Sequence, residues 1–268
     1  MNRLETMLAG RSAPAFIAFI VAGDPDRAKC VQIAKAVIDA GADILELGMP
    51  FSDPVADGPT IQRADERALH GGMNTDLLFD IIREIREYSE IPIVLLTYFN
   101  IVYKRGMDRF YHEASSAGLD AILIVDMPVE ESEEASRLAY DVSIHQIFLV
   151  TPTTSAKRLE LILSKAGGFL YLVSTLGVTG VRKKLSADAL HLIERVKGRT
   201  HLPLAVGFGI STPDQVSQLI RGGADAIIVG SALVDIIEKH LHDWNTACSE
   251  IASYIKRMKQ ASGEYKQE

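Results

Sequence analysis

Short apolar runs alternate with longer amphipathic stretches along almost the whole chain. The apolar runs have the length of strands and are rich in Ile, Val and Leu, whereas the stretches between them repeat apolar residues at helical spacing. Five predicted strands cover residues 15–22, 91–98, 143–150, 169–174 and 202–209. Predicted helices cover residues 76–88, 107–117, 130–140, 187–196 and 212–221.

A repeated phrase marks three further strands. It reads AGADILELG from Ala40, AGLDAILIVD from Ala117 and GGADAIIVGS from Gly222. In each copy a helical pattern stops at a glycine, which suits a left-handed helix cap, and an apolar run follows two residues later. The phrase predicts a repeated strand–helix unit and brings the total to about eight strands.

Apolar strands that are each followed by a helix indicate a parallel sheet covered by helices. Eight such units in a chain of 268 residues favour a closed (β/α)8 barrel, a TIM barrel, over an open doubly wound sheet. No linker rich in Pro, Ser or Gly divides the chain, so we expect one domain over residues 1–268. An extra helix over residues 2–9 is expected to plug the bottom of the barrel, and the polar tail from about residue 261 is expected to fray.

Composition excludes some classes of function. The chain has 35 acidic and 28 basic residues, a formal charge of −7 and no basic tract, so nucleic acid is not an expected partner. Cys30 and Cys248 are the two cysteines, and neither lies at metal-ligand spacing from another Cys or His. No apolar segment reaches the ~20 residues that span a bilayer. We expect a cytoplasmic protein with free thiols, no membrane contact and no metal.

In a barrel of this kind, the functional groups lie on the loops that follow the C-terminal ends of the strands. The strand over residues 44–48 alternates its faces, which directs Leu45 and Leu47 towards the helices and Glu46 into the barrel. Burial should raise the pKa of Glu46 towards neutrality, as suits a general acid and base. The alternative is a structural ion pair, but the predicted strands carry few basic residues to form one.

Asp57 closes the loop PFSDPVADG, just before a helix predicted to begin at Pro59. An Asp-Gly-Pro sequence suits a helix cap or a turn. A loop that returns to the barrel mouth could equally bring Asp57 close to Glu46. The residues alone leave both readings open.

Glycine-rich turns follow the last three predicted strands, at residues 176–180, 207–211 and 229–233. Glycine lets backbone N–H groups approach an anion closely, and a helix that starts at Gly230-Ser231 adds oriented donors. Each glycine taken singly is more often part of a turn. Together on one rim, where barrels commonly bind phosphate, they indicate a phosphorylated small molecule.

The motifs ELGMPFSDPVADGPTIQ, DMPVEES, STLGVTGVR and VGFGIS, in this order and spacing, resemble the family of tryptophan synthase α subunits. Members of that family are TIM barrels that split indole-3-glycerol phosphate by a retro-aldol reaction into indole and glyceraldehyde 3-phosphate. They need no cofactor of their own. Their indole passes to a β subunit, which uses pyridoxal phosphate to join it to L-serine. The resemblance thus implies a lyase of tryptophan biosynthesis within an α2β2 complex.

The same resemblance implies roles for individual residues. It makes Glu46 the catalytic proton shuttle and Asp57 its catalytic partner on the indole N–H. Implied substrate contacts are Phe19, Ile61, Tyr98, Ile124, Tyr171, Thr179 and Phe208. Implied phosphate contacts are Gly180, Gly209, Gly230 and Ser231. Implied contacts with the β subunit are Asp53, Pro54 and Pro128, for which rigid surface turns without a partner are the alternative.

One position departs from the family, because Thr175 stands where better-known bacterial members have Arg. The loop over residues 176–186 is expected to open and close over the site. Two other functions remain open: a subunit that mainly activates the β partner, and a barrel enzyme that isomerises or condenses another phosphorylated intermediate.

Overall fold

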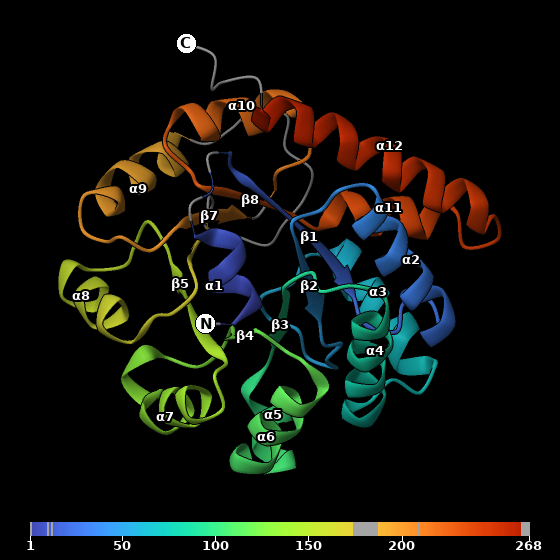
Figure 1. The fold of residues 1–268 in the computed structure, drawn as a ribbon, viewed down its shortest axis with the longest axis horizontal. Helices are drawn as coiled ribbons and strands as arrows, with labels where there is room; N and C mark the ends of the chain where they lie inside the picture. The colour runs from blue at the N-terminus through green and yellow to red at the C-terminus, as the bar shows by residue number, and fades with distance from the viewer. Residues whose placement is uncertain (1, 10, 12, 174–186, 208, 264–268) are drawn as a thin grey trace.

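Eight parallel strands form a closed barrel in sequence order, with β8 paired to β1 (Figure 1). The computed structural model describes residues 2–9, 11, 13–173, 187–207 and 209–263. The strands are β1 (Ala15–Val21), β2 (Ile44–Gly48), β3 (Ile93–Thr97), β4 (Ala121–Ile124), β5 (His145–Val150), β6 (Leu170–Val173), β7 (Leu204–Gly207) and β8 (Ala226–Val229). This confirms the TIM barrel expected from the sequence.

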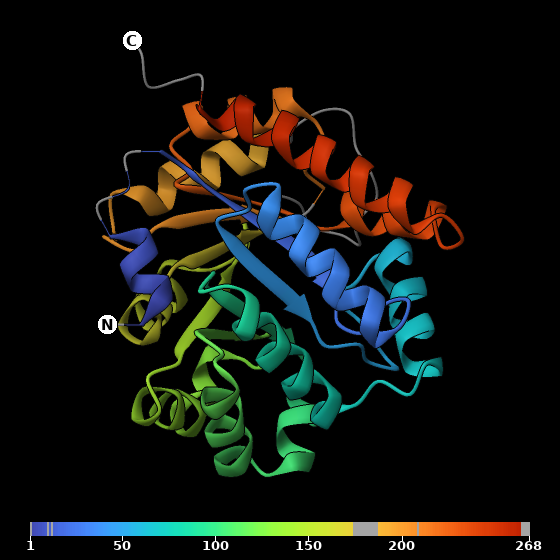
Figure 2. The ribbon, with the colours of Figure 1, turned by 45° about the vertical axis from the view of Figure 1, so that its right-hand side comes forward.

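Helices surround the barrel, and their apolar faces cover its outer surface. They are α1 (Arg3–Leu8), α2 (Arg27–Asp39), α3 (Pro59–His70), α4 (Thr75–Tyr88), α5 (Phe99–Arg105), α6 (Met107–Ala117), α7 (Glu133–Asp141), α8 (Ala156–Lys165), α9 (Ala187–Lys197), α10 (Pro213–Arg221), α11 (Ser231–Lys239) and α12 (Trp244–Gly263). The long helix α12 runs along the outside and packs against α2, α10 and α11 (Figure 2). Among the described segments, no helix is both long and apolar enough to cross a membrane.

Several predicted boundaries differ from the structure by up to three residues, and two of these differences have a clear physical reason. The helix expected over residues 130–140 is divided, because a 3-10 turn (Val129–Glu131) ends at Ser132, whose hydroxyl donates to the carbonyl of Val129 at 2.8 Å. The tail was expected to fray from about residue 261. Residues 264–268 lie outside the described part of the chain, but α12 continues to Gly263. There Ser217 donates a 3.1 Å hydrogen bond to the carbonyl of Ala261, and Ala261 and Ser262 are buried.

The repeated phrase makes the same turn three times. Its glycines Gly41, Gly118 and Gly223 all have left-handed φ angles, of 96°, 100° and 101°. A residue with a Cβ would be strained there, which explains why each copy of the phrase has glycine at this position. The expected left-handed turn between helix and strand is therefore confirmed.

The aspartate two residues after each of these glycines ties its strand to the preceding one. Its carboxylate accepts a backbone N–H at the start of that preceding strand: Asp43 from Phe16 at 2.8 Å, Asp120 from Ile93 at 2.9 Å, and Asp225 from Leu204 at 2.9 Å. These carboxylates satisfy N–H groups at the end of the sheet, where the ladder of backbone bonds begins.

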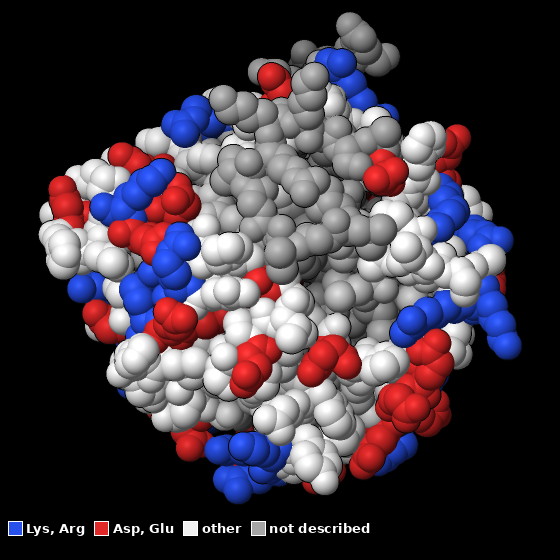
Figure 3. All heavy atoms as spheres, turned by 180° about the vertical axis from the view of Figure 1, so that it is seen from behind, with Lys and Arg blue, Asp and Glu red and all other residues white. Residues whose placement is uncertain are grey.

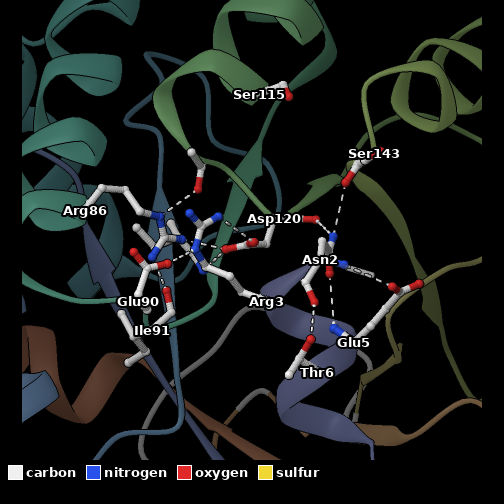
Figure 4. Close-up of polar contacts among 12 residues, drawn as sticks. Asn2, Arg3, Glu5, Thr6, Arg86, Glu90, Ile91, Ser115, Asp120 and Ser143 are labelled. Atoms are coloured by element: carbon white, nitrogen blue, oxygen red, sulfur yellow. Dashed lines mark hydrogen bonds and ion pairs between the residues drawn. The ribbon is translucent and has the colours of Figure 1, made fainter.

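The C-terminal ends of the strands open on the face shown in Figure 3, and α1 covers the opposite end (Figure 1). Leu4 of α1 is fully buried, and the side chain of Asn2 donates to the carbonyls of Asp120 and Ser143 at 2.9 and 3.2 Å. Arg3 also pairs with the buried Asp120 carboxylate (Figure 4). As predicted, the extra helix covers the bottom of the barrel.

Candidate active site

Glu46 points into the barrel from β2. It is fully buried, it lies level with Phe19 of β1 and Val94 of β3, and neither of its carboxylate oxygens has a hydrogen-bond partner among the described residues. Burial, and secondarily the negative charge of Asp57, raises the pKa of Glu46 to about 8. The inward direction expected from alternation is confirmed, and within the described chain no basic residue pairs with this carboxyl.

Asp57 lies at the end of the loop between β2 and α3 and is only 8% exposed. The residue at the cap position of α3 is Gly58, so Asp57 does not cap the helix. Its Oδ2 instead accepts a 2.7 Å hydrogen bond from the hydroxyl of Tyr98. Burial raises the pKa of Asp57, and the hydrogen bond from Tyr98 opposes this rise. The loop thus returns to the barrel mouth and brings the second acid towards Glu46.

Tyr98 holds this loop in place from the end of β3. Its hydroxyl accepts the N–H of Ala56 at 3.1 Å while it donates to Asp57, and its ring stacks on Phe51 with centroids 4.8 Å apart. Because Tyr98 is 1% exposed, its ring has little freedom to move. Tyr98 is not among the residues that line the cavity described next, so it acts on the site through Asp57.

A cavity with an empty volume of about 430 Å³, part of which is open solvent, lies at the barrel mouth. Glu46 does not line it, but Phe19, which lies level with Glu46 on the neighbouring strand, does. Of the residues expected at the site, it is lined by Phe19, Asp57, Ile61, Tyr171, Gly209, Gly230 and Ser231. The sequence reading missed three further lining residues, Leu96, Ile210 and Ile228. Strand alternation would have found Leu96 and Ile228, because Leu96 pairs with Gly48 and Ile228 with Ile17, on the same face as Glu46.

Two glycines make room for the ring of Phe19 in this cavity. A Cβ on Gly48 would come within 2.6 Å of the ring, and one on Gly230 within 2.8 Å. On the other side, a Cβ on Gly207 would meet the hydroxyl of Tyr171 at 2.6 Å. Burial, with the charges of the two acids, raises the pKa of Tyr171 well above its usual value, so its hydroxyl stays protonated. The cavity is therefore lined by aromatic rings and by one carboxylate, that of Asp57.

One end of the cavity is built from backbone. Gly209 has a left-handed φ of 80°, and Gly230 precedes the first turn of α11, where N–H groups lack helical partners. Ser231 adds a hydroxyl at the start of the same helix. Such a helix start attracts an anion through its N–H groups and its dipole. Thr175, Thr179, Gly180, Phe208 and the loop over residues 176–186 lie outside the described residues.

Ile124 was expected at the substrate, but it does not line the cavity. Leu123, not Ile124, pairs with Leu96, which lines the cavity, so alternation turns Ile124 to the opposite face of β4. Ile124 lines a separate hollow beneath the β4 and β5 loops, together with Met127 and Arg158. The error is a shift of one residue, which moves a side chain to the other face of a strand.

The residues expected at a subunit contact lie on the outer rim of the same face. Asp53 and Pro128 are exposed and Pro54 is half-buried. Val55 beside them is 78% exposed, which is unusual for so apolar a side chain. Figure 3 shows that the surface just below the grey atoms is uncharged or acidic, with Lys and Arg farther out. This part of the rim combines rigid loops with apolar and acidic groups.

Other chemistry is not evident in the described part of the chain. It contains no group of three or more His, Cys, Asp or Glu side chains that could hold a metal ion. Cys30 is buried and Cys248 half-buried, and both are free thiols.

Comparison with known proteins agrees with these observations. The family model for the tryptophan synthase alpha chain matches residues 6–263. A tryptophan synthase alpha chain from Methanoregula boonei is 55% identical over 98% of this chain and 99% of its own length, and one from Methanothermobacter thermautotrophicus is 47% identical over 93% and 92%.

Solved structures give the same result. A tryptophan synthase alpha chain from Legionella pneumophila superimposes with a TM-score of 0.91 at 33% identity and covers 100% of both chains. A structure of the tryptophan synthase a2b2 complex from Pyrococcus furiosus matches with a TM-score of 0.86 at 38% identity, over 92% of this chain and 98% of that one. This chain therefore belongs to the tryptophan synthase alpha chain family.

Proposed function

We propose that this lyase of tryptophan biosynthesis splits indole-3-glycerol phosphate into indole and glyceraldehyde 3-phosphate by a retro-aldol reaction. The observation that carries the proposal is the buried carboxyl of Glu46, which has no hydrogen-bond partner among the described residues and lies within the electrostatic influence of Asp57, a residue that lines the cavity. A retro-aldol cleavage needs a group that first gives a proton and then takes one. A carboxyl with a pKa of about 8 can do both near neutral pH.

Glu46 is proposed as the proton shuttle. In its protonated form it delivers a proton to the indole ring carbon that bears the glycerol side chain. The resulting carboxylate then takes the proton of the side-chain hydroxyl next to that carbon, while the carbon–carbon bond breaks and its electron pair returns to the ring. Indole and an aldehyde leave, and Glu46 is again protonated, so no cofactor of this chain is required.

Asp57 is proposed to accept the indole N–H and to stabilise the positive charge that develops on the ring after protonation. Its hydrogen bond from Tyr98 favours the ionised form that this role needs. Two neighbouring acids can divide the work in this way because their surroundings differ: among the described residues, the carboxyl of Glu46 has no hydrogen-bond donor and that of Asp57 has one.

The phosphate of the substrate is proposed to bind at Gly209, Gly230 and Ser231, with Thr179 and Gly180 contributing from their loop. The start of α11 and the left-handed turn at Gly209 support this, since both present backbone N–H groups to the cavity. Phe19, Ile61 and Tyr171, with Phe208, are proposed to enclose the indole ring. Their apolar surfaces would exclude water from the charged intermediate.

A β subunit is the proposed partner, as in the Pyrococcus furiosus a2b2 complex. Pyridoxal phosphate would reside in that subunit, which would condense indole with L-serine. Asp53, Pro54 and Pro128 on the rim are the proposed contacts, because prolines fix a loop before binding and lower its ordering cost. The free thiols of Cys30 and Cys248 fit the reducing cytoplasm, where we propose that the complex works.

Indole release by the purified chain from indole-3-glycerol phosphate, with and without β subunit, tests this function. Cleavage by the chain alone, increased by the β subunit, is the expected result. Activity only in the complex would indicate a partner-dependent enzyme. No cleavage in either case, with turnover of another sugar phosphate, would overturn the proposal.

A further inference from the structure

The three copies of the repeated phrase differ in how their aspartates are neutralised. In the first copy, Lys259 lies 2.9 Å from the carboxylate of Asp43 and also donates to the carbonyl of the turn glycine. In the second, Arg86 lies 2.5 Å from Asp120 and donates to the corresponding glycine carbonyl at 2.9 Å. In both copies a cation from a neighbouring helix covers the turn and closes an ion pair.

The third copy has the same parts but no such pair. Lys197, at the end of α9, reaches over the turn, and its ammonium group occupies the place where a Cβ of Gly223 would project. Within the described parts of the chain, however, Lys197 makes no hydrogen bond or ion pair, and the carboxylate of Asp225 accepts only the N–H of Leu204. An anion and a cation that pair elsewhere are therefore kept apart here.

A cavity with an empty volume of about 1210 Å³ lies between them and is open to solvent. Lys197, His201, Arg221 and Asp225 line it, so basic groups predominate around one carboxylate. This is unusual on a chain whose formal charge is −7. The cavity lies at the α1 end of the barrel, beside α9 and α10, which Figure 1 shows in front view. It is thus on the face opposite the proposed active site.

The cavity also has an apolar wall, formed in part by Pro203 and Ile220. A ligand that fits must offer a positive group to Asp225, a negative group to Lys197 and an apolar body to this wall. A simple anion would leave the Asp225 carboxylate without a partner, and a simple cation would be repelled by Lys197 and Arg221. A zwitterion meets both charges at once, and its charge-assisted hydrogen bonds would replace the ion pair found in the other two copies.

We propose that this cavity is a binding site for a small zwitterion with an apolar side chain, that is, an α-amino acid. The ammonium group of the ligand binds the Asp225 carboxylate oxygen that Leu204 leaves unused. Its carboxylate binds Lys197, with Arg221 adding positive charge, and its side chain packs on Ile220. This site is independent of the cleavage reaction, so the two proposals can fail separately.

Four probes test the charge requirement: L-phenylalanine, 3-phenylpropionate without the ammonium group, phenethylamine without the carboxylate, and inorganic phosphate. Binding is measured by amide chemical shifts of the isotope-labelled chain during titration. L-Phenylalanine is expected to bind saturably and at least ten-fold more tightly than each of the other probes. Equal binding of 3-phenylpropionate or phosphate would show a plain anion site, and no saturable binding of L-phenylalanine would show no site; either overturns the proposal.

Variants locate the site. Lys197→Gln and Asp225→Asn are each expected to weaken L-phenylalanine binding at least ten-fold without changing indole release. Arg199→Gln is the matched control, because this substitution removes the same charge two residues from Lys197. Arg199 pairs with Glu160 at 3.5 Å and does not line the cavity. Thermal unfolding checks the fold, and Lys197→Gln decides the question if Asp225→Asn is unstable. Unchanged affinity in Lys197→Gln would refute the assignment.

Discussion

The hydroxyl of Tyr98 donates a 2.7 Å hydrogen bond to Oδ2 of Asp57, so a residue beyond β3 orients the acid that the loop after β2 supplies. The same hydroxyl accepts the N–H of Ala56. One buried phenol thus fixes both the backbone and the side chain at the mouth of the barrel. Tyr98 is therefore a positioning residue, and removal of its hydroxyl should change the pKa of Asp57.

Tyr98→Phe keeps the ring that stacks on Phe51 and removes the hydroxyl. A hydrogen bond to a charged group contributes about 1.5–3 kcal/mol, so indole release should fall about ten- to a hundred-fold. The lost donor also raises the pKa of Asp57, which shifts the acidic limb of the pH–rate profile to higher pH. Tyr103→Phe, at an exposed tyrosine, should change neither quantity. An unshifted acidic limb in Tyr98→Phe would refute the positioning role.

Glu46→Gln should reduce indole release by roughly a thousand-fold or more, because an amide can neither give nor take the proton. In the unchanged enzyme, kcat should decline as pH rises above about 8, where Glu46 loses the proton that starts the reaction. Binding of a phosphorylated substrate analogue should survive the substitution. Steady-state kinetics from pH 6 to pH 10, sampled at roughly half-unit steps, provide the measurement, and substantial turnover by Glu46→Gln would exclude the proposed shuttle.

Glu46 should also make the stability of the fold depend on pH. Its pKa is about 8 in the folded chain against an ordinary value of 4.5, so between these values only the folded state keeps the proton. The free energy of unfolding should therefore fall as pH rises from 4.5 to 8, by up to about 4 kcal/mol. Glu46→Gln should lose the part of this pH dependence that comes from Glu46.

Urea unfolding across the same pH range measures that effect. The pKa of Asp65 is also raised to about 8, by burial and the nearby carboxylates, and acts in the same direction. Because Asp65 is present in both proteins, the difference between them isolates Glu46. Identical pH slopes would show that Glu46 ionises without cost.

Gly230→Ala should weaken catalysis by crowding Phe19. The added Cβ would lie 2.8 Å from the ring, which must move within a cavity that positions the substrate. A displacement of about 1 Å can reduce kcat/KM by about a hundred-fold. Gly198→Ala is the control, since nothing lies within 4 Å of its Cβ position. Equal kcat/KM for the two variants would show that Phe19 tolerates the shift.

Asp120→Ala should destabilise the fold by about 3–5 kcal/mol, because it leaves the half-buried Arg86 and the N–H of Ile93 without their shared acceptor. Glu90→Gln is the comparison. Glu90 also pairs with Arg3, but its side chain is 79% exposed, so solvent screens the pair and the loss should be much smaller than for Asp120→Ala. Chemical denaturation of both variants measures the difference; a similar small loss in both would mean that Asp120 contributes little.

Much of the fold could be read from the sequence, because the barrel is built from local patterns. Strand alternation placed Glu46 in the interior, and the glycine of each repeated phrase marked a left-handed turn. Ile124, which was expected at the substrate from the family resemblance, lies on the other face of β4, one residue away from the inward-facing Leu123. The alternation of side chains shows which residues of a strand face the barrel interior only when the register of that strand is known.

What could not be read depends on contacts between distant segments. The position of Asp57 beside Glu46 follows from how a loop folds back and from Tyr98, 41 residues further along the chain. The sequence shows an aspartate in each copy of the repeated phrase. The backbone N–H that it binds lies on the preceding strand, 27 residues away for Asp43 and 21 for Asp225. Sequence spacing carries no information about such partners.

The aspartate ties also have a direction. They join β1 to β2, β3 to β4 and β7 to β8, always an odd-numbered strand to the even-numbered strand that follows it. Among the described residues no such carboxylate links β2 to β3, β4 to β5, β5 to β6 or β6 to β7. The pair β4 and β5 has a different side-chain link, because Gln146 of β5 donates a 3.3 Å hydrogen bond to the carbonyl of Ile122 in β4. The closed cylinder therefore contains three pairs of strands that are tied by side chains, and it should part first along the seams that no such side chain crosses.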